Sequence, residues 1–225
     1  MSADGIISQT GQAQAQGPAS AHAPARRASA APVLRRLILA ITGASGMIYA
    51  RRLLAYLLES EAEVHLLISR HAATVLREEL GLDPEYFQQM PLVYHDYRNF
   101  SSPLATGSFH TQGMIIAPCS MNSLAAVSQG LSLNLIHRAA AVCLKERRKL
   151  ILVPRESPLS SIHLKNMLAL SQEGAIILPA SPAFYNHPKD LDELVEFFVQ
   201  RILDQIGLAS ARVEAYARER NVVEP

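Results

Sequence analysis

Five short polar segments follow apolar runs in the sequence, and they contain most of the side chains that could bind a ligand. Four of the segments offer hydroxyl groups close to an expected helix start, and two contain an arginine. Hydroxyl groups combined with the unpaired N–H groups of a helix N-terminus are well suited to bind phosphate. We therefore predict a phosphorylated ligand. The segments are residues 42–46, 69–70, 118–120, 154–157 and 179–182.

The turn after the first apolar run reads Gly43-Ala44-Ser45-Gly46. It is not a dinucleotide-binding fingerprint, because Ser45 stands where that motif has its second glycine. It is not a hydrolase nucleophile elbow either, since Met47 stands where that motif needs glycine. Two interpretations stay open here, namely a phosphate-binding turn and a tight strand-to-helix turn in which Ser45 caps the helix.

A second candidate segment opens a predicted helix and contains a cysteine. Ser120 and Ser123 place two hydroxyl groups near the positive end of that helix. Cys119 is either a nucleophile or a small buried apolar residue, and buried cysteines of the second kind are the more common. No histidine or acid stands in a sequence relation that would activate its thiol.

Cations recur at two places that could face a ligand. Arg138 and Lys145 lie seven residues apart on one predicted helix, so they share a face. Positive charge near a helix C-terminus is also favourable without any ligand, which leaves a solvated helix as the alternative. Arg155 and Glu156 follow a buried run, where they either contact a ligand or form a structural ion pair.

The loop at residues 179–188 contains three prolines and Tyr185, so it is expected to hold a phenol in a fixed position. Asp190, Asp192 and Glu193 follow this loop. Acids at a helix N-terminus are the ordinary capping pattern, and the spacing differs from that of aspartate-rich diphosphate sites. We therefore expect no metal.

Short apolar runs alternate with helical patterns along the chain, which predicts an α/β fold. We expect a three-layer, Rossmann-like or flavodoxin-like sandwich with a mainly parallel sheet, and ligands at the carboxyl ends of its strands. Residues 83–103 are expected to form an insertion or long loop. The runs are residues 37–41, 64–68, 114–117, 150–153 and 175–178, and the helices are expected over 48–59, 72–80, 121–129, 135–147, 162–172 and 191–206.

The composition limits the class of protein. The chain has 225 residues, of which 49% are hydrophobic, and a formal net charge of +1. The charge gives no reason to expect a nucleic-acid or membrane partner, and the apolar share excludes disorder of the whole chain. Two cysteines exclude a disulfide framework and favour a reducing compartment.

Three parts of the chain are predicted. Residues 1–34 are rich in alanine, glutamine and proline and are expected to be a disordered tail, residues 35–208 a single domain, and residues 209–225 a C-terminal tail. We expect a cytoplasmic protein, or a mitochondrial one if the N-terminal tail is a presequence.

From residue 37 to about residue 207 the sequence resembles the UbiX/Pad1 flavin prenyltransferases. Several motifs occur in the family's order, and the basic block from Leu144 to Leu159 is the most specific of them. The remaining stretches are residues 42–46, 107–109, 118–124, 138–140, 163–167 and 182–185.

This resemblance implies transfer of a dimethylallyl group from dimethylallyl monophosphate to N5 and C6 of reduced FMN, without a metal. The product would be prenylated FMN, the cofactor of UbiD-type decarboxylases, which act in ubiquinone synthesis or in aromatic-acid degradation. The resemblance also implies a homo-oligomer, typically a dodecamer, with active sites built across subunit interfaces.

The resemblance further assigns residue roles. Tyr185 and Arg201 would bind the phosphate of the prenyl donor, with Arg138 and Lys145 from a neighbouring subunit. Glu156 and Glu79 would join Lys145, Tyr185 and Arg201 in catalysis by assisting proton movement. The flavin would be bound by Gly43, Ala44, Ser45, Ser69, Ser120, Met121, Asn122, Ser123 and Arg155.

Two departures and two alternatives accompany the resemblance. Ser123 replaces a threonine that is common in the family, and the chain lacks the tryptophan that relatives often carry near the C-terminus. A cysteine decarboxylase of the related FMN-binding group would share the fold. A non-catalytic flavin carrier would need no second phosphate site, so Arg138, Lys145 and Arg201 argue against it.

Overall fold

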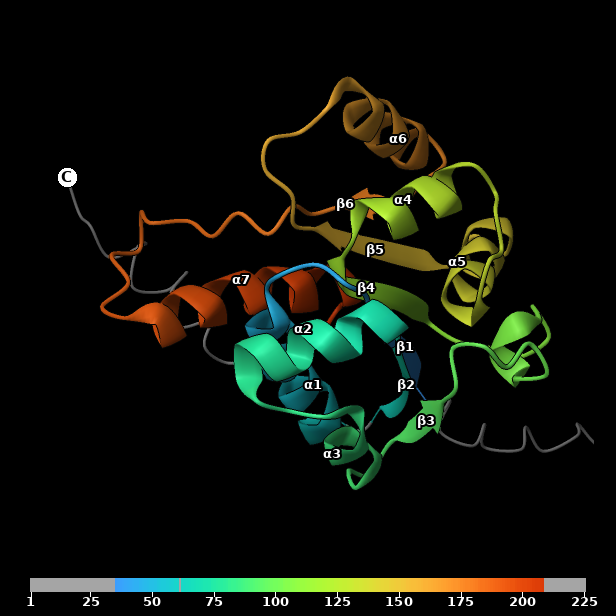
Figure 1. Ribbon diagram of the computed structural model, residues 1–225, viewed down its shortest axis with the longest axis horizontal. Coiled ribbons are helices and arrows are strands. Elements are labelled where there is room, and N and C mark those ends of the chain that lie inside the picture. The colour runs from blue at the N-terminus through green and yellow to red at the C-terminus, as the bar shows by residue number, and fades with distance from the viewer. Residues whose placement is uncertain (1–34, 61, 209–225) are drawn as a thin grey trace, which may run out of the picture. The chain divides into compact units, whose positions relative to one another are not determined.

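A computed structural model describes residues 35–60 and 62–208 of the protein. These residues form a sheet of six strands in the order β3-β2-β1-β4-β5-β6, and every neighbouring pair of strands is parallel. Helices cover both faces of the sheet (Figure 1). The predicted three-layer α/β sandwich is thereby confirmed, with the strand order of a Rossmann-like fold. The two predicted tails lie outside the described residues.

Each of the five predicted apolar runs forms a strand. Four of these strands are buried along nearly their whole length, because helices lie on both sides of them. The fifth, β6, is only two residues long and half-buried. The strands are β1 (Arg36–Ile41), β2 (Glu63–Ile68), β4 (Gly113–Cys119), β5 (Lys149–Pro154) and β6 (Ile176–Ile177).

The prediction of a long loop over residues 83–103 was wrong. This segment contains helix α3 (Pro84–Gln88) and edge strand β3 (Val93–His95), and a short 3-10 turn η1 (Pro103–Ala105) begins at its end. Strand β3 pairs with β2 through His65 and Val93. Its three residues are exposed or half-buried, so the sequence shows no apolar run at this place.

The helices fall into two groups, one on each face of the sheet (Figure 1). Helices α1, α2 and α7 contribute to one core, whereas α4 and α5 contribute to the other, and α6 packs against α4. Their bounds lie within two residues of the prediction at most ends. They are α1 (Met47–Glu59), α2 (Arg70–Leu80), α4 (Met121–Ser128), α5 (Leu135–Lys145), α6 (Ser161–Gln172) and α7 (Leu191–Ile206).

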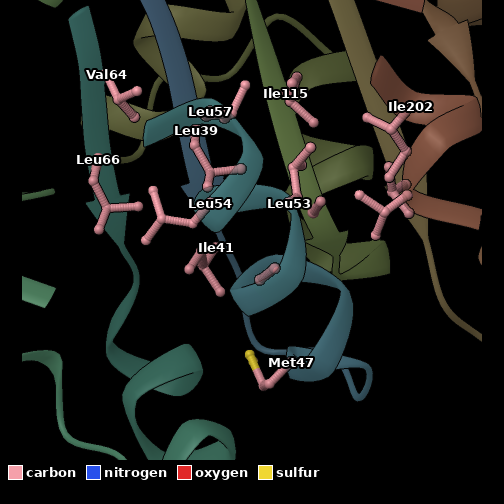
Figure 2. Close-up of a cluster of buried hydrophobic side chains, with 14 of the residues drawn as sticks. Leu39, Ile41, Met47, Leu53, Leu54, Leu57, Val64, Leu66, Ile115 and Ile202 are labelled. Atoms are coloured by element: carbon pink, nitrogen blue, oxygen red, sulfur yellow. The ribbon is translucent and has the colours of Figure 1, made fainter. Parts of the chain in front are cut away.

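The alternation of side chains along β1 explains why its sequence is a continuous apolar run. Leu39 and Ile41 face the core under α1, where they meet Leu53 and Leu54 (Figure 2). Ile38 points to the opposite face and packs in the core under α4 and α5. A strand covered on both faces needs an apolar residue at every position, since successive side chains point to opposite sides.

No helix in residues 35–60 and 62–208 is long and apolar enough to cross a membrane. In the same part of the chain, no group of three or more histidine, cysteine, aspartate or glutamate side chains is placed to hold a metal ion.

Candidate active site

The strand order reverses between β1 and β4, and the carboxyl ends of these two strands are tied together by Thr42. Its buried Oγ1 donates a hydrogen bond to the Pro118 carbonyl at 3.0 Å and accepts one from the Ser120 N–H at 2.7 Å. In open parallel sheets ligands bind outside the strands at such a switch point. The sequence motifs did not indicate that Thr42 links the two strands. Its position directly after a buried strand was the signal that could have indicated it.

The turn at Gly43 leaves no room for a side chain. A Cβ atom on Gly43 would lie 2.5 Å from the His71 Cβ, because the first turn of α2 packs directly over it. Gly46 has a φ of 108°, a left-handed conformation that glycine adopts without strain. Both glycines are therefore required by the path of the backbone between β1 and α1.

The interpretation of Ser45 as the cap of α1 was wrong, because Gly46 is the N-cap residue and Glu79 supplies the acceptor. The Glu79 carboxylate accepts hydrogen bonds from the Gly46 N–H at 3.0 Å and from the Met47 N–H at 2.8 Å. Glu79 comes from α2, so the sequence next to the turn gave no sign of it. A carboxylate is well placed here, since the helix N-terminus carries partial positive charge.

Two of the predicted hydroxyl groups cap the helices that follow their strands. Ser69 Oγ accepts from the Ala72 N–H at 3.2 Å at the start of α2. Ser120 Oγ accepts from the Ser123 N–H at 3.3 Å and donates to Ser123 Oγ at 3.1 Å at the start of α4. Among the other residues of this segment, Met121 is buried and Asn122 is exposed.

Cys119 is fully buried at the end of β4, and this burial raises the pKa of its thiol to about 12. The thiolate, which is the reactive form of cysteine, is therefore scarce at neutral pH. The interpretation of Cys119 as a small buried residue is confirmed.

Arg155 reaches back from the end of β5 to the turn after β1. Its Nε donates to the Ser45 carbonyl at 3.4 Å, and its side chain is exposed at this edge of the sheet. Glu156 is also exposed and accepts a hydrogen bond from the Ser157 N–H. The two side chains do not pair with each other within the described residues, so the alternative of a structural ion pair was wrong.

Tyr185 and Arg201 line one pocket of about 340 Å³ beyond the end of β6. The Tyr185 ring packs edge-to-face on Phe197, with ring centroids 5.4 Å apart. Arg201 donates to the Asp204 carboxylate at 3.1 Å, and about half of its side chain is exposed. The structure thus brings together two of the residues predicted to bind the donor phosphate.

Arg138 and Lys145 do not join that pocket within one subunit. They lie on α5, which packs on the opposite face of the sheet from α7, the helix that carries Arg201. Arg138 Nε donates to the Ala105 carbonyl at 2.9 Å, and Lys145 pairs with Glu146. The hydrogen bond and the charge of Lys145 lower the pKa of the Glu146 carboxyl.

Comparison with known proteins identifies the family. Residues 26–203 match the family described as Flavoprotein. Flavin prenyltransferase UbiX of Methanocaldococcus jannaschii is 48% identical over 173 residues, which are 77% of this chain and 94% of the relative. The mitochondrial flavin prenyltransferase PAD1 of Saccharomyces cerevisiae is 46% identical over 183 residues, which are 81% of this chain and 76% of the relative.

Two solved structures share the fold at similar identity. AnUbiX (PadA1) in complex with FMN and dimethylallyl pyrophosphate has a TM-score of 0.77 at 40% identity, with 78% of this chain and 94% of that chain covered. A dodecameric FMN-dependent UbiX-like decarboxylase from Escherichia coli O157:H7 has a TM-score of 0.75 at 44% identity, with 77% and 96% covered. The chain therefore belongs to the family of UbiX-type flavin prenyltransferases, which are enzymes.

Proposed function

We propose that the protein transfers the dimethylallyl group of dimethylallyl monophosphate to N5 and C6 of reduced FMN and releases phosphate. The product, prenylated FMN, would serve a UbiD-type decarboxylase. The observation that carries this proposal is that two separate sets of groups able to bind phosphate lie at one edge of the sheet. One lies at the switch point between β1 and β4, and the other contains Tyr185 and Arg201 in the pocket beyond β6.

The residues at the switch point fit the phosphate and polyol groups of FMN. The lack of a side chain at Gly43 lets the turn pack tightly against His71, and Ala44 and Ser45 follow beside it. Ser69 and Ser120 place hydroxyl groups at two helix N-termini, where a phosphate is favoured. We propose that Arg155 and residues 121–123 complete this flavin site.

When bound, reduced FMN supplies the electron-rich ring atoms that accept the prenyl group. The residues of this chain act mainly on the other partner, the prenyl phosphate. Breaking its allylic C–O bond leaves positive charge on carbon and adds negative charge to the phosphate. Tyr185 and Arg201 would donate hydrogen bonds to that phosphate from fixed positions, which stabilises the transition state.

We propose that Arg138 and Lys145 complete the phosphate site of a neighbouring subunit. Their place on the opposite face of the sheet from Arg201 supports an arrangement across an interface. The dodecameric state of the E. coli neighbour supports the same assembly for this chain. Four donors of this kind would offset the charge of the leaving phosphate without a divalent cation.

Glu156 and Glu79 are the proposed proton-transfer residues. Glu156 is exposed next to Arg155, where its carboxylate can take up and return a proton. Glu79 lies at the turn between β1 and α1 and also fixes that turn through the Gly46 and Met47 N–H groups. Its substitution would therefore affect both the turn and the chemistry.

The cytoplasm is the proposed location of the protein. The mitochondrial PAD1 of S. cerevisiae supports the alternative, in which residues 1–34 would act as a presequence. A fusion of residues 1–34 to a fluorescent protein, expressed in yeast, distinguishes the cytoplasmic from the mitochondrial location. Only a presequence would direct the fusion into mitochondria.

Mass spectrometry of the flavin tests the reaction. The protein is incubated without oxygen with reduced FMN and either dimethylallyl monophosphate or dimethylallyl diphosphate. We expect a five-carbon unit on the flavin and faster formation with the monophosphate. Unchanged FMN recovered from protein that binds both compounds would contradict the proposal and favour a flavin carrier. Carbon dioxide released from an aromatic acid by the protein alone would instead favour the decarboxylase activity named for the E. coli neighbour.

A further inference from the structure

A chain of polar side chains crosses the three neighbouring strands β1, β2 and β3. His65 in β2 is 2% exposed, and its Nδ1 lies 2.9 Å from Nε2 of His95 in β3. The second nitrogen of His95, Nδ1, lies 2.9 Å from Ser102 Oγ. On the other side, His65 Nε2 lies 3.0 Å from Glu63 Oε1, and the other oxygen of Glu63 accepts from Arg36 Nε at 3.1 Å.

The charge of Glu63 favours one direction for the hydrogen bonds that run from His65 through His95 to Ser102. His65 Nε2 lies 3.0 Å from the Glu63 carboxylate without hydrogen-bond geometry, and the negative charge favours the tautomer of neutral His65 that carries its proton on Nε2. His65 Nδ1 must then accept from His95 Nε2, which leaves His95 Nδ1 as an acceptor for the Ser102 hydroxyl. The Ser102 hydroxyl therefore has a defined partner and a defined orientation.

Burial of the two imidazoles favours their neutral forms. Burial lowers the pKa of His65 and that of His95, and Arg36 lowers the first further, while Glu63 opposes these effects at His65. His95 faces His65 and Ser102, and neither of them compensates a positive charge. At neutral pH both imidazoles are thus expected to be uncharged, with the hydrogen bonds running in the direction described above.

Ser102 connects this chain to the segment that follows it. Its Oγ accepts from the Leu104 N–H at 3.3 Å and so caps η1, which ends at Ala105. The Ala105 carbonyl in turn accepts from Arg138 Nε at 2.9 Å. Further along, the Phe109 ring packs edge-to-face on His65, with ring centroids 5.2 Å apart.

The same segment contacts the basic end of α5 at two more points. Arg148 donates to the carbonyls of Phe109 at 2.8 Å and of Gly107 at 2.5 Å. Gly107 lies so close to the Lys145–Glu146 pair that a side chain at this position would collide with the Glu146 carboxylate. Residues 102–109 therefore form the surface against which Arg138 and Lys145 are held.

We propose that Ser102, His95 and His65 are positioning residues that hold residues 102–109 and thereby orient Arg138 toward the prenyl phosphate of a neighbouring subunit. This inference rests on the proposed function, because it assigns Arg138 to the phosphate. None of the three residues needs to touch a substrate. Their effect would fall mainly on binding of the prenyl donor, since none of the three residues belongs to the proposed flavin site.

The experiment compares the full-length protein with Ser102→Ala, Ser102→Thr and, as a matched control, Ser101→Ala. Ser101 is the exposed neighbouring serine, and its side chain is outside the chain of hydrogen bonds. Four quantities are measured. They are the KM for dimethylallyl monophosphate, the kcat, the Kd for FMN, and the hydrogen–deuterium exchange rates of residues 102–109.

We expect Ser102→Ala to raise the KM for the prenyl donor about tenfold, the equivalent of ~1.4 kcal/mol, with an FMN Kd that changes less than about twofold. Exchange in residues 102–109 should become faster, whereas Ser102→Thr and Ser101→Ala should match the wild type. If Ser102→Ala does not fold, the experiment uses His95→Gln instead. Glutamine keeps a donor for His65 but lacks the nitrogen that accepts from Ser102. The same changes in KM, FMN Kd and exchange are expected.

Unchanged KM and unchanged exchange in Ser102→Ala would overturn the proposal. It would also be overturned by an equal loss of FMN binding and prenyl-donor binding, because that result indicates a general structural role. A wild-type protein that transfers no prenyl group would refute the proposed function instead. In that case the exchange rates still decide whether Ser102 holds residues 102–109.

Discussion

Thr42 and Ser120 are joined by a hydrogen bond of 2.7 Å from the Ser120 N–H to the Thr42 hydroxyl, and they stand at the ends of the two strands between which the strand order reverses. The same hydroxyl donates to the Pro118 carbonyl, so it acts as a hydrogen-bond donor and as an acceptor at the same time. One buried side chain therefore fixes the distance between the turn after β1 and the start of α4. Both segments belong to the proposed flavin site.

Replacing Thr42 by valine should destabilise the protein and weaken FMN binding. Valine has the same shape but leaves the half-buried Ser120 N–H without an acceptor, a cost of about 1–3 kcal/mol. Urea unfolding and fluorescence titration with FMN measure the two effects. Thr42→Ser keeps the hydroxyl and should retain FMN affinity, and an equal loss in both variants would show that the methyl group matters instead.

Arg201→Ala and Lys145→Ala should fold and bind FMN but transfer the prenyl group slowly. Loss of one fixed donor to the leaving phosphate costs about 3 kcal/mol in the transition state, which is a fall of about 10²-fold in rate. Single-turnover formation of prenylated FMN measures it. Arg77→Ala is the control, since Arg77 lies exposed on α2 and pairs with Asp83. Normal rates in Arg201→Ala would refute the phosphate role of that residue.

Mixing the two defective subunits should restore part of the activity. Arg201 lies on α7 and Lys145 on α5, on opposite faces of one subunit, so an interface site would take each residue from a different chain. Co-expressed Arg201→Ala and Lys145→Ala subunits then form some sites with both native residues. Transfer rates of the mixed particle, compared with each parent, test this. A mixture no faster than its parents would place both residues in the same subunit's site.

The stability of the protein should fall as the pH drops from 6.5 to 4. Burial and the neighbouring His65 lower the pKa of His95 from 6.5 to about 4. The unfolded chain therefore binds a proton in this range while the folded chain does not, so acid favours unfolding. At about 1.4 kcal/mol per pKa unit, this single group accounts for a loss of roughly 2–3 kcal/mol.

Urea unfolding of the wild type and of His95→Gln at pH 7 and at pH 4.5 measures this dependence. At pH 7 the free energy of unfolding of His95→Gln should be lower than that of the wild type. Between pH 7 and pH 4.5 it should fall by less than that of the wild type. An identical pH dependence in both proteins would assign the acid sensitivity to other groups, of which buried His137 is the next candidate because burial also lowers its pKa.

Cys119 should be inert in the native protein. Its buried thiol has a pKa raised to about 12, so iodoacetamide at pH 8 should label it only after unfolding. Peptide mass spectrometry with and without urea measures the labelling. Cys119→Ala should retain prenyl transfer, and loss of transfer in a stable variant would revive the interpretation of Cys119 as a nucleophile.

The sequence by itself determined the layered α/β fold and indicated the edge of the sheet at which we propose that ligands bind. Five apolar runs specified five strands, because a strand covered on both faces needs an apolar residue at every position. The capping serines Ser69 and Ser120 and the aspartate Asp190 at the start of α7 were also predictable, since a cap and its N–H partner are close in the sequence.

Only the tertiary structure decided which distant residues meet. Glu79 rather than Ser45 supplies the acceptor for α1, and Thr42 links two strands, because both contacts depend on how separate elements pack. Edge strand β3 was missed since its three residues are stabilised by pairing with β2 and not by an apolar pattern of their own. The hydrogen bonds from His65 through His95 to Ser102 exist only because that pairing places the two imidazoles side by side.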